Sequence, residues 1–324
     1  MTKVSNRLNR LSESATLAMA QMSRELQAKG VNVISLSLGE PDFNTPEFIK
    51  EAAKKAIDDN FSHYTPVPGL PELKSAIVTK FKRDNDLEFT ANQIVTSTGA
   101  KQSLANVCLC LLNPGDEVLL PCPYWVSYAE IIKLAEGVPV EVPSNIDTDF
   151  KVTAKELEIA ITPNTKMLMF SSPCNPSGTV YTKSELEDIA SMLEKYPDIY
   201  IVSDEIYEHI NFTKKHFSIG TIPSMIDRTI TVNGVSKGFA MTGWRVGFIG
   251  APLWIAKACN KIQGQITSAT CAIAQKATER AMLAEPKSTT KEMKNTFLKR
   301  RDMLIEVLKD IPGIKCNIPQ GAFY

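Results

Sequence analysis

Short apolar runs alternate with amphipathic segments along most of this 324-residue chain, and this alternation limits the folds that the chain can adopt. The runs that read as strands are residues 94–97, 117–120, 138–142, 167–171, 200–203, 229–232 and 246–249. Helical patterns separate most of them, at residues 71–83, 102–112, 128–136, 183–195 and 253–263. Strands that are apolar on both faces and separated by helices are typical of a parallel sheet covered on both sides. We therefore predict an α/β fold whose large domain contains a mostly parallel, seven-stranded sheet covered by helices.

The two ends of the chain differ from this middle part. Residues 1–30 read as a polar helix that leads into residues 33–38, and residues 291–309 read as a long charged helix. We assign both ends to a smaller α+β domain that packs against the large one. The expected division is 1–45 for the N-terminal part of the small domain, 46–285 for the large domain and 286–324 for the C-terminal part.

The last residues, 321–324, read as the beginning of a strand, because an apolar aromatic run follows Pro319 and Gly321. A chain that stops there would leave a sheet unfinished. We therefore expect a C-terminally truncated chain with an incomplete small domain.

Charge balance and apolar content exclude several classes of protein. Lys and Arg number 36, as do Asp and Glu, so no basic surface for nucleic acid or an anionic membrane is expected. The longest apolar runs, such as residues 107–112, are too short to cross a bilayer, and the N-terminus shows no export signal. The cytoplasm is the expected compartment. The 7 cysteines have no C-x-x-C pair and the 3 histidines have no ligand spacing, so we expect buried reduced thiols and no metal site.

Residues 235–247 contain a lysine, Lys237, that directly follows Ser236 and lies eight positions before Arg245. Lysine is the side chain that forms an imine with a carbonyl cofactor. Serine and arginine are suited to hold a phosphate. This order predicts pyridoxal phosphate attached at Lys237, with Lys237 as the catalytic residue. For an isolated lysine, a surface position beside a strand would be the more common alternative.

Two strand ends carry polar groups that suit the same cofactor. Residues 199–207 run from an apolar strand into Asp204 and Tyr207, and ligands of open α/β sheets bind beyond the carboxyl ends of strands. A carboxylate at Asp204 would keep a pyridine nitrogen protonated, and Tyr207 could hydrogen-bond the cofactor's phenolic oxygen. In residues 170–178, two prolines and a glycine stiffen the turn and aim Asn175, whose amide could donate to the same oxygen. Taken separately, Asp204 could instead cap a helix, and Asn175 could belong to a plain Asn-Pro turn.

Residues 94–102 read as a strand, a turn of small residues and a helix start. Backbone N–H groups at such a start would cradle a phosphate, with Gly99 and Ala100 allowing close approach and Lys101 adding a cation. Trp125 directly follows another strand and could stack on a flat heteroaromatic ring. For residues 94–102, the alternative is a turn of a kind common in α/β proteins. For Trp125, the alternative is an aromatic residue that closes the edge of the core.

Together these segments resemble the class I and II aminotransferases of pyridoxal-phosphate fold type I, and most closely the bacterial subgroup of aspartate aminotransferases. The resemblance covers almost the whole chain. It rests on these motifs: Ser37-Leu-Gly-Glu-Pro-Asp-Phe43, Tyr64-Thr-Pro-Val-Pro-Gly69, Gly99-Ala-Lys-Gln102, Asn175-Pro-Ser-Gly178, Ser203-Asp-Glu-Ile-Tyr207 and Ser236-Lys-Gly-Phe-Ala-Met-Thr-Gly-Trp-Arg245.

The resemblance implies the roles of the cofactor-binding residues. Lys237 would carry pyridoxal phosphate in a covalent linkage, and Asp204 would pair with its pyridine nitrogen. Asn175 and Tyr207 would bind the ring oxygen, and Trp125 would stack on the ring. The residues expected to hold the phosphate are Gly99, Ala100, Ser236 and Arg245.

The resemblance also implies transamination. An amino acid would leave its amino group on the cofactor and depart as a 2-oxo acid, and a second oxo acid, 2-oxoglutarate, would reverse this half-reaction. The freed amine of Lys237 would move the proton from the substrate Cα. Tyr64 would reach the phosphate of a neighbouring subunit, so a homodimer with shared active sites is expected.

Substrate contacts follow from the same resemblance. The residues expected to bind the substrate are Gly39, Lys101, Trp125 and Asn175. The backbone at Gly39 and the amide of Asn175 would contact the α-carboxylate. Lys101 would pair with the side-chain carboxylate, assisted by Ser268 or Thr267, so L-aspartate and glutamate are the expected donors.

Two departures from the family pattern qualify this interpretation. Family members carry a carboxylate-binding arginine near the C-terminus, and this chain ends at Tyr324 before such a position, so cofactor binding with poor turnover is expected. Residues 11–14 replace a Lys-Pro pair often found in the subgroup, which argues against prephenate as a substrate. A carbon–sulfur lyase of the same fold and a cofactor-binding domain without turnover are the alternatives. The presence of Lys237, Asp204 and Arg245 together argues against the second for a longer parent protein, while it stays an alternative for the chain as given.

Overall fold

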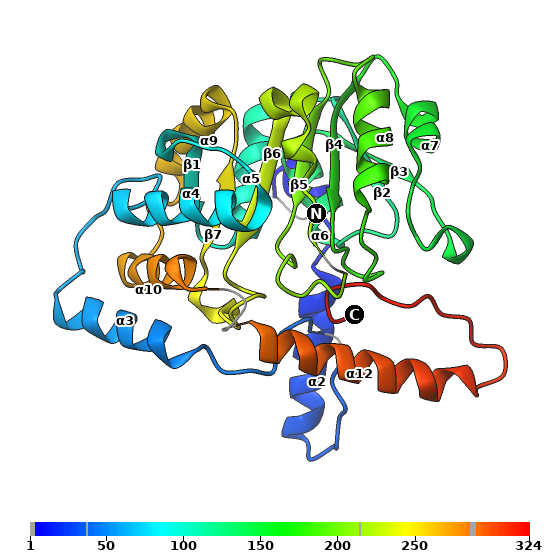
Figure 1. Ribbon diagram of the computed structural model, residues 1–324, viewed down its shortest axis with the longest axis horizontal. Helices are drawn as coiled ribbons and strands as arrows, with labels where there is room; N and C mark the ends of the chain where they lie inside the picture. Colours follow the sequence, from blue (N-terminus) through cyan, green and yellow to red (C-terminus); the bar gives the residue numbers. More distant parts are fainter. Residues whose placement is uncertain (1–3, 37, 214, 286–289) are drawn as a thin grey trace.

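A seven-stranded sheet forms the centre of the computed structural model, which describes residues 4–36, 38–213, 215–285 and 290–324. The strand order is β1-β7-β6-β5-β4-β2-β3 (Figure 1). β7 is antiparallel to both of its neighbours, and the other pairs are parallel. The strands are β1 (Ile94–Ser97), β2 (Glu117–Pro121), β3 (Val138–Val142), β4 (Thr165–Ser171), β5 (Tyr200–Asp204), β6 (Thr229–Gly234) and β7 (Gly247–Gly250). The predicted α/β class and mostly parallel sheet are confirmed.

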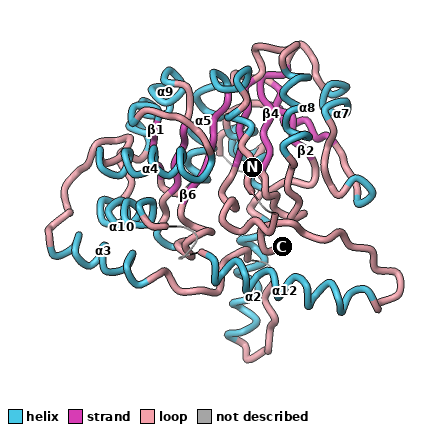
Figure 2. Tube along the Cα trace, viewed as in Figure 1, coloured by secondary structure: helices cyan, strands magenta, loops and turns pink. Residues whose placement is uncertain are grey.

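Helices lie around the sheet, so that the strands are enclosed between them in Figure 2. The α-helices are α1 (Asn6–Asn9), α2 (Ala15–Ala28), α3 (Glu47–Asp58), α4 (Pro71–Asn85), α5 (Ala100–Leu111), α6 (Ser127–Leu134), α7 (Ala154–Ala160), α8 (Lys183–Leu193), α9 (Leu253–Ile266), α10 (Ala272–Leu283) and α12 (Lys291–Lys309). Short 3-10 helices lie in the connections: η1 (Ala91–Gln93), η2 (Ile146–Thr148), η3 (Ile219–Thr221), η4 (Pro223–Arg228) and η5 (Thr242–Trp244).

The central strands are apolar on both faces because each face packs against a different layer of helices. In β4, Met167 and Met169 belong to a core shared with α5, α6 and α9. Leu168 and Phe170, which alternate with them, belong to a second core shared with α8. Successive side chains of a strand point to opposite faces, so this alternation accounts for the continuous apolar runs in the sequence.

A third core lies against β1 and β7, under α3, α4 and α10. Phe81 of α4 is fully buried at its centre. Its ring packs edge-to-face against Phe89, with centroids 5.2 Å apart, and against Phe248 of β7, with centroids 5.5 Å apart. These contacts fix α4 onto the edge of the sheet.

The N-terminal and C-terminal segments meet away from the sheet. The carboxylate of Asp42 accepts two hydrogen bonds from the Arg300 guanidinium of α12, at 2.7 and 2.8 Å. The rings of Phe43 and Phe297 pack edge-to-face with centroids 5.5 Å apart. The long charged helix predicted at residues 291–309 is confirmed as α12.

The strand predicted to begin at residues 321–324 is wrong. Gly321 makes a single antiparallel bridge with Asn211, and Ala322 has a φ of 57°, which interrupts the extended backbone. The Ala322 N–H still donates to the Ile210 carbonyl at 2.7 Å, so the segment is tied to the chain that follows β5. No helix in the described part of the chain has the length and apolar character needed to span a membrane.

Replacement of Phe81 by alanine is expected to lower the free energy of unfolding by about 3–5 kcal/mol, because it empties a fully buried site. Urea unfolding followed by circular dichroism measures the change. Ile159 is 76% exposed, so Ile159→Ala is the matched control and should change stability by less than about 0.5 kcal/mol. A Phe81→Ala protein as stable as the control would show that this contact does not hold α4 on the sheet.

Candidate active site

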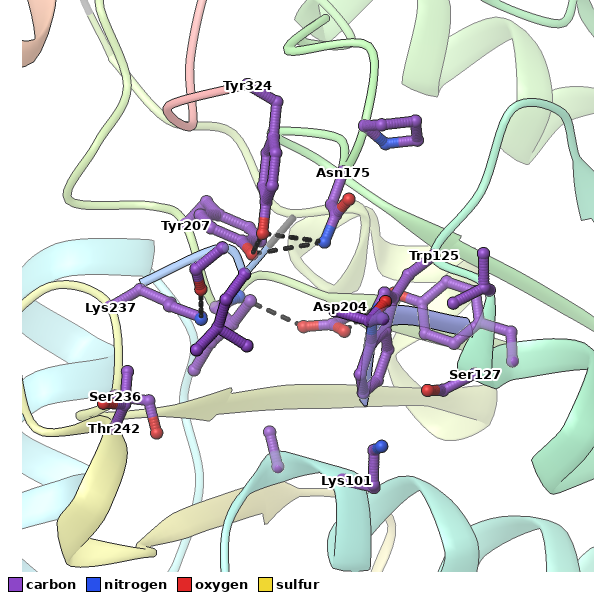
Figure 3. A pocket seen from close by; sticks show the side chains of 18 of the residues that line it. Lys101, Trp125, Ser127, Asn175, Asp204, Tyr207, Ser236, Lys237, Thr242 and Tyr324 are labelled. Atoms are coloured by element: carbon purple, nitrogen blue, oxygen red, sulfur yellow. Dashed lines mark hydrogen bonds between the residues drawn. The ribbon is translucent and has the colours of Figure 1, made fainter. Parts of the chain in front are cut away.

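A cavity of about 430 Å³ opens at the carboxyl ends of the parallel strands, between them and the N-terminal segment (Figure 3). Its volume lies in the range of small-molecule and cofactor sites. Its lining residues are Ser14, Thr16, Leu17, Leu36, Leu38, Gly39, Ala100, Lys101, Tyr124, Trp125, Val126, Ser127, Tyr128, Asn175, Pro176, Asp204, Ile206, Tyr207, Ser236, Lys237, Thr242, Arg245 and Tyr324. Most of the residues predicted from separate motifs are therefore brought together here.

Lys237 enters the cavity from the turn that follows β6. Its Nζ donates a hydrogen bond of 2.6 Å to the backbone carbonyl of Gly39. Burial, opposed by the negative charge of Glu40, lowers the pKa of the Lys237 amine to about 8. A surface position, the common alternative for a lysine, is excluded. An amine with this pKa can both release and accept a proton near neutral pH.

Asp204 ends β5 and lies buried on the opposite side of the cavity in Figure 3. The Tyr128 hydroxyl donates to its Oδ2 at 2.7 Å, and the Ile206 N–H donates to its Oδ1 at 3.2 Å. Burial raises the pKa of the carboxyl to about 6, although the hydrogen bond from Tyr128 works in the other direction. The residues that follow Asp204 form a turn and not a helix, so the helix-cap alternative is wrong. The carboxylate lines the cavity, where a cationic ligand group would relieve its desolvation.

Asn175 and Tyr207 converge on one point in the cavity, and a phenolic oxygen occupies that point. The Tyr324 hydroxyl accepts a hydrogen bond from Asn175 Nδ2 at 3.1 Å and lies 2.9 Å from the Tyr207 hydroxyl. Asn175 Nδ2 also donates to Tyr207 Oη at 3.3 Å. The pair thus forms a binding position for a phenolic oxygen, which Figure 3 shows beneath Tyr324.

The turn between β1 and α5 lies against the segment that carries Arg245. Gly99 has a φ of +85°, and a Cβ there would lie 2.3 Å from Arg245 Nη2. A Cβ on Gly247 would lie 2.1 Å from the Ala100 nitrogen. Both glycines are needed for this approach, which places the N-terminus of α5 beside a guanidinium. A helix N-terminus with an adjacent arginine is suited to bind a phosphate. Ser236 lines the same cavity.

Trp125 and Lys101 lie together on the cavity wall. Lys101 Nζ is 4.9 Å from the centroid of the Trp125 ring, a cation–π distance. Burial, together with the positive charge of Arg245, lowers the pKa of Lys101. The Trp125 ring packs edge-to-face on Tyr128, with centroids 5.6 Å apart. Trp125 therefore lines the cavity and also packs against the core beside it, so both of the positions considered for it are present.

Comparison with known proteins assigns the family. The profile described as aminotransferase class I and II matches residues 31–324. This chain belongs to the class I and II aminotransferases. An aspartate/prephenate aminotransferase of Cereibacter sphaeroides is 45% identical over 326 residues, which cover 100% of this chain and 81% of that protein. One from Nitrosomonas europaea is 45% identical over 324 residues, which cover 99% of this chain and 81% of that protein.

Solved structures of aspartate aminotransferases have the same fold as this aminotransferase. The aspartate aminotransferase of Rhizobium meliloti matches with a TM-score of 0.95 and 38% identity, over 99% of this chain and 81% of that chain. The aspartate aminotransferase of Thermus thermophilus with maleate matches with a TM-score of 0.95 and 40% identity, over 99% of this chain and 84% of that chain. The resemblance expected from the motifs is confirmed.

Some predicted residues of the aminotransferase lie outside the cavity. Tyr64 is 99% exposed and lines a separate surface hollow with residues of the segment before α10. Thr267 and Ser268 do not line the cavity, and the Thr267 hydroxyl accepts a hydrogen bond from Gln102 at 2.5 Å. Ser37 lies outside the described residues.

Sequence reasoning missed two residues of the site. Tyr128 follows Trp125 by about one helical turn, a spacing that places both on one side of a helix start and could have indicated its role. Tyr324 reaches Asn175 and Tyr207 only because the chain turns at Ala322, and no local pattern indicates that contact.

Replacement of Tyr128 by phenylalanine is expected to raise the pKa of Asp204 above its value of about 6, because the lost hydrogen bond stabilises the ionised carboxylate. Carbon-13 NMR of protein labelled at the aspartate carboxyl groups measures the titration. Tyr124→Phe is the control, because the Tyr124 hydroxyl donates to Glu141 instead, at 2.6 Å. An unchanged Asp204 titration in Tyr128→Phe would refute the assigned role of this hydroxyl.

Proposed function

We propose that this chain is a pyridoxal-phosphate-dependent aminotransferase that transfers the amino group of L-aspartate to a 2-oxo acid, with 2-oxoglutarate as the acceptor. The observation that carries the proposal is the placement of the Lys237 amine in one cavity with Asp204 and the Asn175–Tyr207 pair. The names of the matched relatives and structures agree with this reaction and favour it over a carbon–sulfur lyase.

The residues of the cavity fit pyridoxal phosphate by the chemistry of their donors. The cofactor has an aldehyde, a pyridine nitrogen, a phenolic oxygen and a phosphate. The Asn175–Tyr207 pair already holds a phenolic oxygen, that of Tyr324. The buried Asp204 carboxylate lacks a cationic partner within hydrogen-bond distance among the described residues, and a protonated pyridine nitrogen would supply one.

We assign each group to the residues that would hold it. Lys237 would bind the aldehyde, Asp204 the ring nitrogen, and Asn175 with Tyr207 the phenolic oxygen, while Trp125 would stack on the ring. The phosphate would be held by Gly99, Ala100, Ser236 and Arg245. When bound, the protonated cofactor ring withdraws electrons from the substrate Cα and so makes its proton acidic.

Lys237 is the group that would move this proton. Its pKa of about 8 leaves a fraction of the amine neutral at physiological pH. The hydrogen bond to the Gly39 carbonyl orients Nζ toward the cavity wall formed by the N-terminal segment, where the substrate carboxylate is expected. A fixed amine near the reacting carbon removes the entropic cost of bringing in an external base.

Lys101 supports a dicarboxylic substrate. Its ammonium group lies over Trp125 on the cavity wall without an acidic partner in any described ion pair, so a substrate carboxylate could bind there. The Thermus thermophilus structure contains maleate, which is a dicarboxylate. Gly39 and Asn175 would contact the other carboxylate. We do not propose prephenate as a substrate, because residues 11–14 lack the Lys-Pro pair often found in the subgroup.

We further propose a homodimer with shared active sites and a location in the cytoplasm. Tyr64 is exposed and does not line the cavity of its own chain, so its hydroxyl could reach the site of a second copy. The contacts of Asp42 and Phe43 with α12 support a small domain built from residues 1–45 and 286–324, beside a large domain of 46–285. The boundary at 286 falls outside the described residues.

Borohydride reduction of protein purified from vitamin-replete cells is expected to fix the cofactor on Lys237, as found by peptide mapping. A Lys237→Ala variant should carry no label at all. Addition of aspartate to the unreduced protein should shift its visible absorbance band, since the amino group passes to the cofactor. An unmodified amine at 237 in replete protein would overturn the proposed function.

Replacement of Lys101 by alanine is expected to lower kcat/KM for aspartate by about 100-fold, in line with the loss of a charge-assisted contact, and to change turnover of an aromatic amino acid much less. Lys133→Ala, in which the lost ammonium pairs with Glu130 elsewhere, is the control and should change neither. Equal losses on both substrates would contradict the assigned role of Lys101.

A further inference from the structure

The end of β5 and the turn after it present some side chains to the cavity and others to a buried polar cluster. Asp204, Ile206 and Tyr207 line the cavity. Glu205 and Glu208 come from the same turn but lie on its other side, with 1% and 7% of their surface exposed. The residues that would bind the cofactor and two buried acids therefore share one short piece of backbone.

Glu205 has hydrogen-bond donors on both carboxylate oxygens. Its Oε1 accepts from Ser203 Oγ at 3.0 Å and from Ser218 Oγ at 2.6 Å. Its Oε2 accepts from Asn85 Nδ2 at 2.9 Å and contacts His216 Nε2 at 2.8 Å. These partners come from β5, from the end of α4 and from the loop before η3, so one carboxylate connects three parts of the fold.

The cluster contains its own cation. Lys80 of α4 is 1% exposed, pairs with the Glu208 carboxylate and donates to Asn85 Oδ1 at 2.5 Å. His216 can add positive charge that offsets the two acids. Burial acts to lower the pKa of His216, but the neighbouring Glu205 carboxylate outweighs this and raises it. The acids and histidines lie close enough to suggest a metal site. The buried ammonium of Lys80 instead supplies the positive charge that such a site would need.

A buried carboxylate is a costly way to hold a turn, and a well-packed apolar residue of similar volume would often stabilise a fold as well. What the carboxylate adds is direction, because each of its hydrogen bonds fixes an angle as well as a distance. The backbone N–H of Glu205 also donates to the Val232 carbonyl of β6 at 2.9 Å, which fixes the turn to the strand that leads to Lys237.

We infer, on the basis of the proposed function, that Glu205 is a positioning residue whose buried hydrogen bonds hold Asp204 and Tyr207 in the geometry that binds the cofactor. It touches neither substrate nor cofactor and acts through the turn. The cluster with Lys80 and Glu208 supports it from α4.

Glu205→Gln tests this role, because it preserves the shape of the side chain. One acceptor oxygen becomes an NH₂ group. At the position of Oε2 it would face the Asn85 donor, and at the position of Oε1 the Ser203 and Ser218 hydroxyls would have to accept instead of donate, so hydrogen bonds that hold the turn change in either orientation. The Lys80–Glu208 pair stays balanced, which favours folding of the variant. Ser218→Ala is a milder second variant that removes a single donor. Leu186→Ala, in the core under α8, is the control for a general loss of stability.

The readouts are the dissociation constant of pyridoxal phosphate and the pH at which the absorbance of the bound cofactor changes. Glu205→Gln is expected to weaken binding about tenfold, the loss typical when a partner that orients a ligand is removed. It should also move the absorbance midpoint by about half a pH unit or more. Ser218→Ala should change the dissociation constant and the absorbance midpoint in the same direction but by less. Leu186→Ala should keep the wild-type dissociation constant and midpoint, even if its Tm falls as much as that of Glu205→Gln.

Wild-type values in both Glu205→Gln and Ser218→Ala would overturn the inference. So would an equal change in Leu186→Ala, because that would reduce Glu205 to a general stabilising role. If Glu205→Gln does not fold, the midpoint of Ser218→Ala decides the question alone. A wild-type protein that fails to bind pyridoxal phosphate would instead overturn the proposed function, and this inference with it.

Discussion

The rest of this structure depends on two ionisable groups enclosed by one cavity, the partly buried amine of Lys237 and the buried carboxyl of Asp204. Removing such groups from water is costly, and burial moves their pKa values toward each other, to about 8 and about 6. Each keeps a hydrogen-bond partner from another part of the chain, the Gly39 carbonyl and the Tyr128 hydroxyl. The cavity therefore exists only when the sheet, α6 and the N-terminal segment are all in place.

The parallel sheet brings these parts together. Because parallel strands end at the same edge, Asp204 at the end of β5 and Lys237 after β6 both reach the cavity at this edge of the sheet. Gly99 and Gly247 let the β1–α5 turn approach Arg245 on the same edge. Behind the edge, Glu205 ties the turn to α4 and to the loop before η3. Rigid elements thus fix the candidate site from behind as well as from its own wall.

Most of the fold could be predicted because its information is local. The runs at β1 and β3 match their predicted bounds, and the others differ by a few residues at their ends. Strands such as β4 are apolar on both faces, and this pattern can be recognised in the sequence without knowing which helices pack against the strand. The strand expected at 321–324 failed for the opposite reason. Its apolar aromatic residues fit a strand, but the backbone turns at Ala322 to meet Ile210, a contact far away in the sequence.

The sequence by itself determined which chemical groups stand at the strand ends: the amine of Lys237, the acid of Asp204, the amide of Asn175 and the phosphate-binding turn at Gly99. Only the tertiary structure decided their protonation and their partners. Tyr128 donates to Asp204, and Tyr324 shares a point with Asn175 and Tyr207, across long sequence separations. His209 and His216, which have no ligand spacing, proved to lie partly buried beside Glu208 and Glu205. Residue type is a local property of the chain, whereas desolvation and hydrogen-bond pairing depend on everything that folding packs around a group.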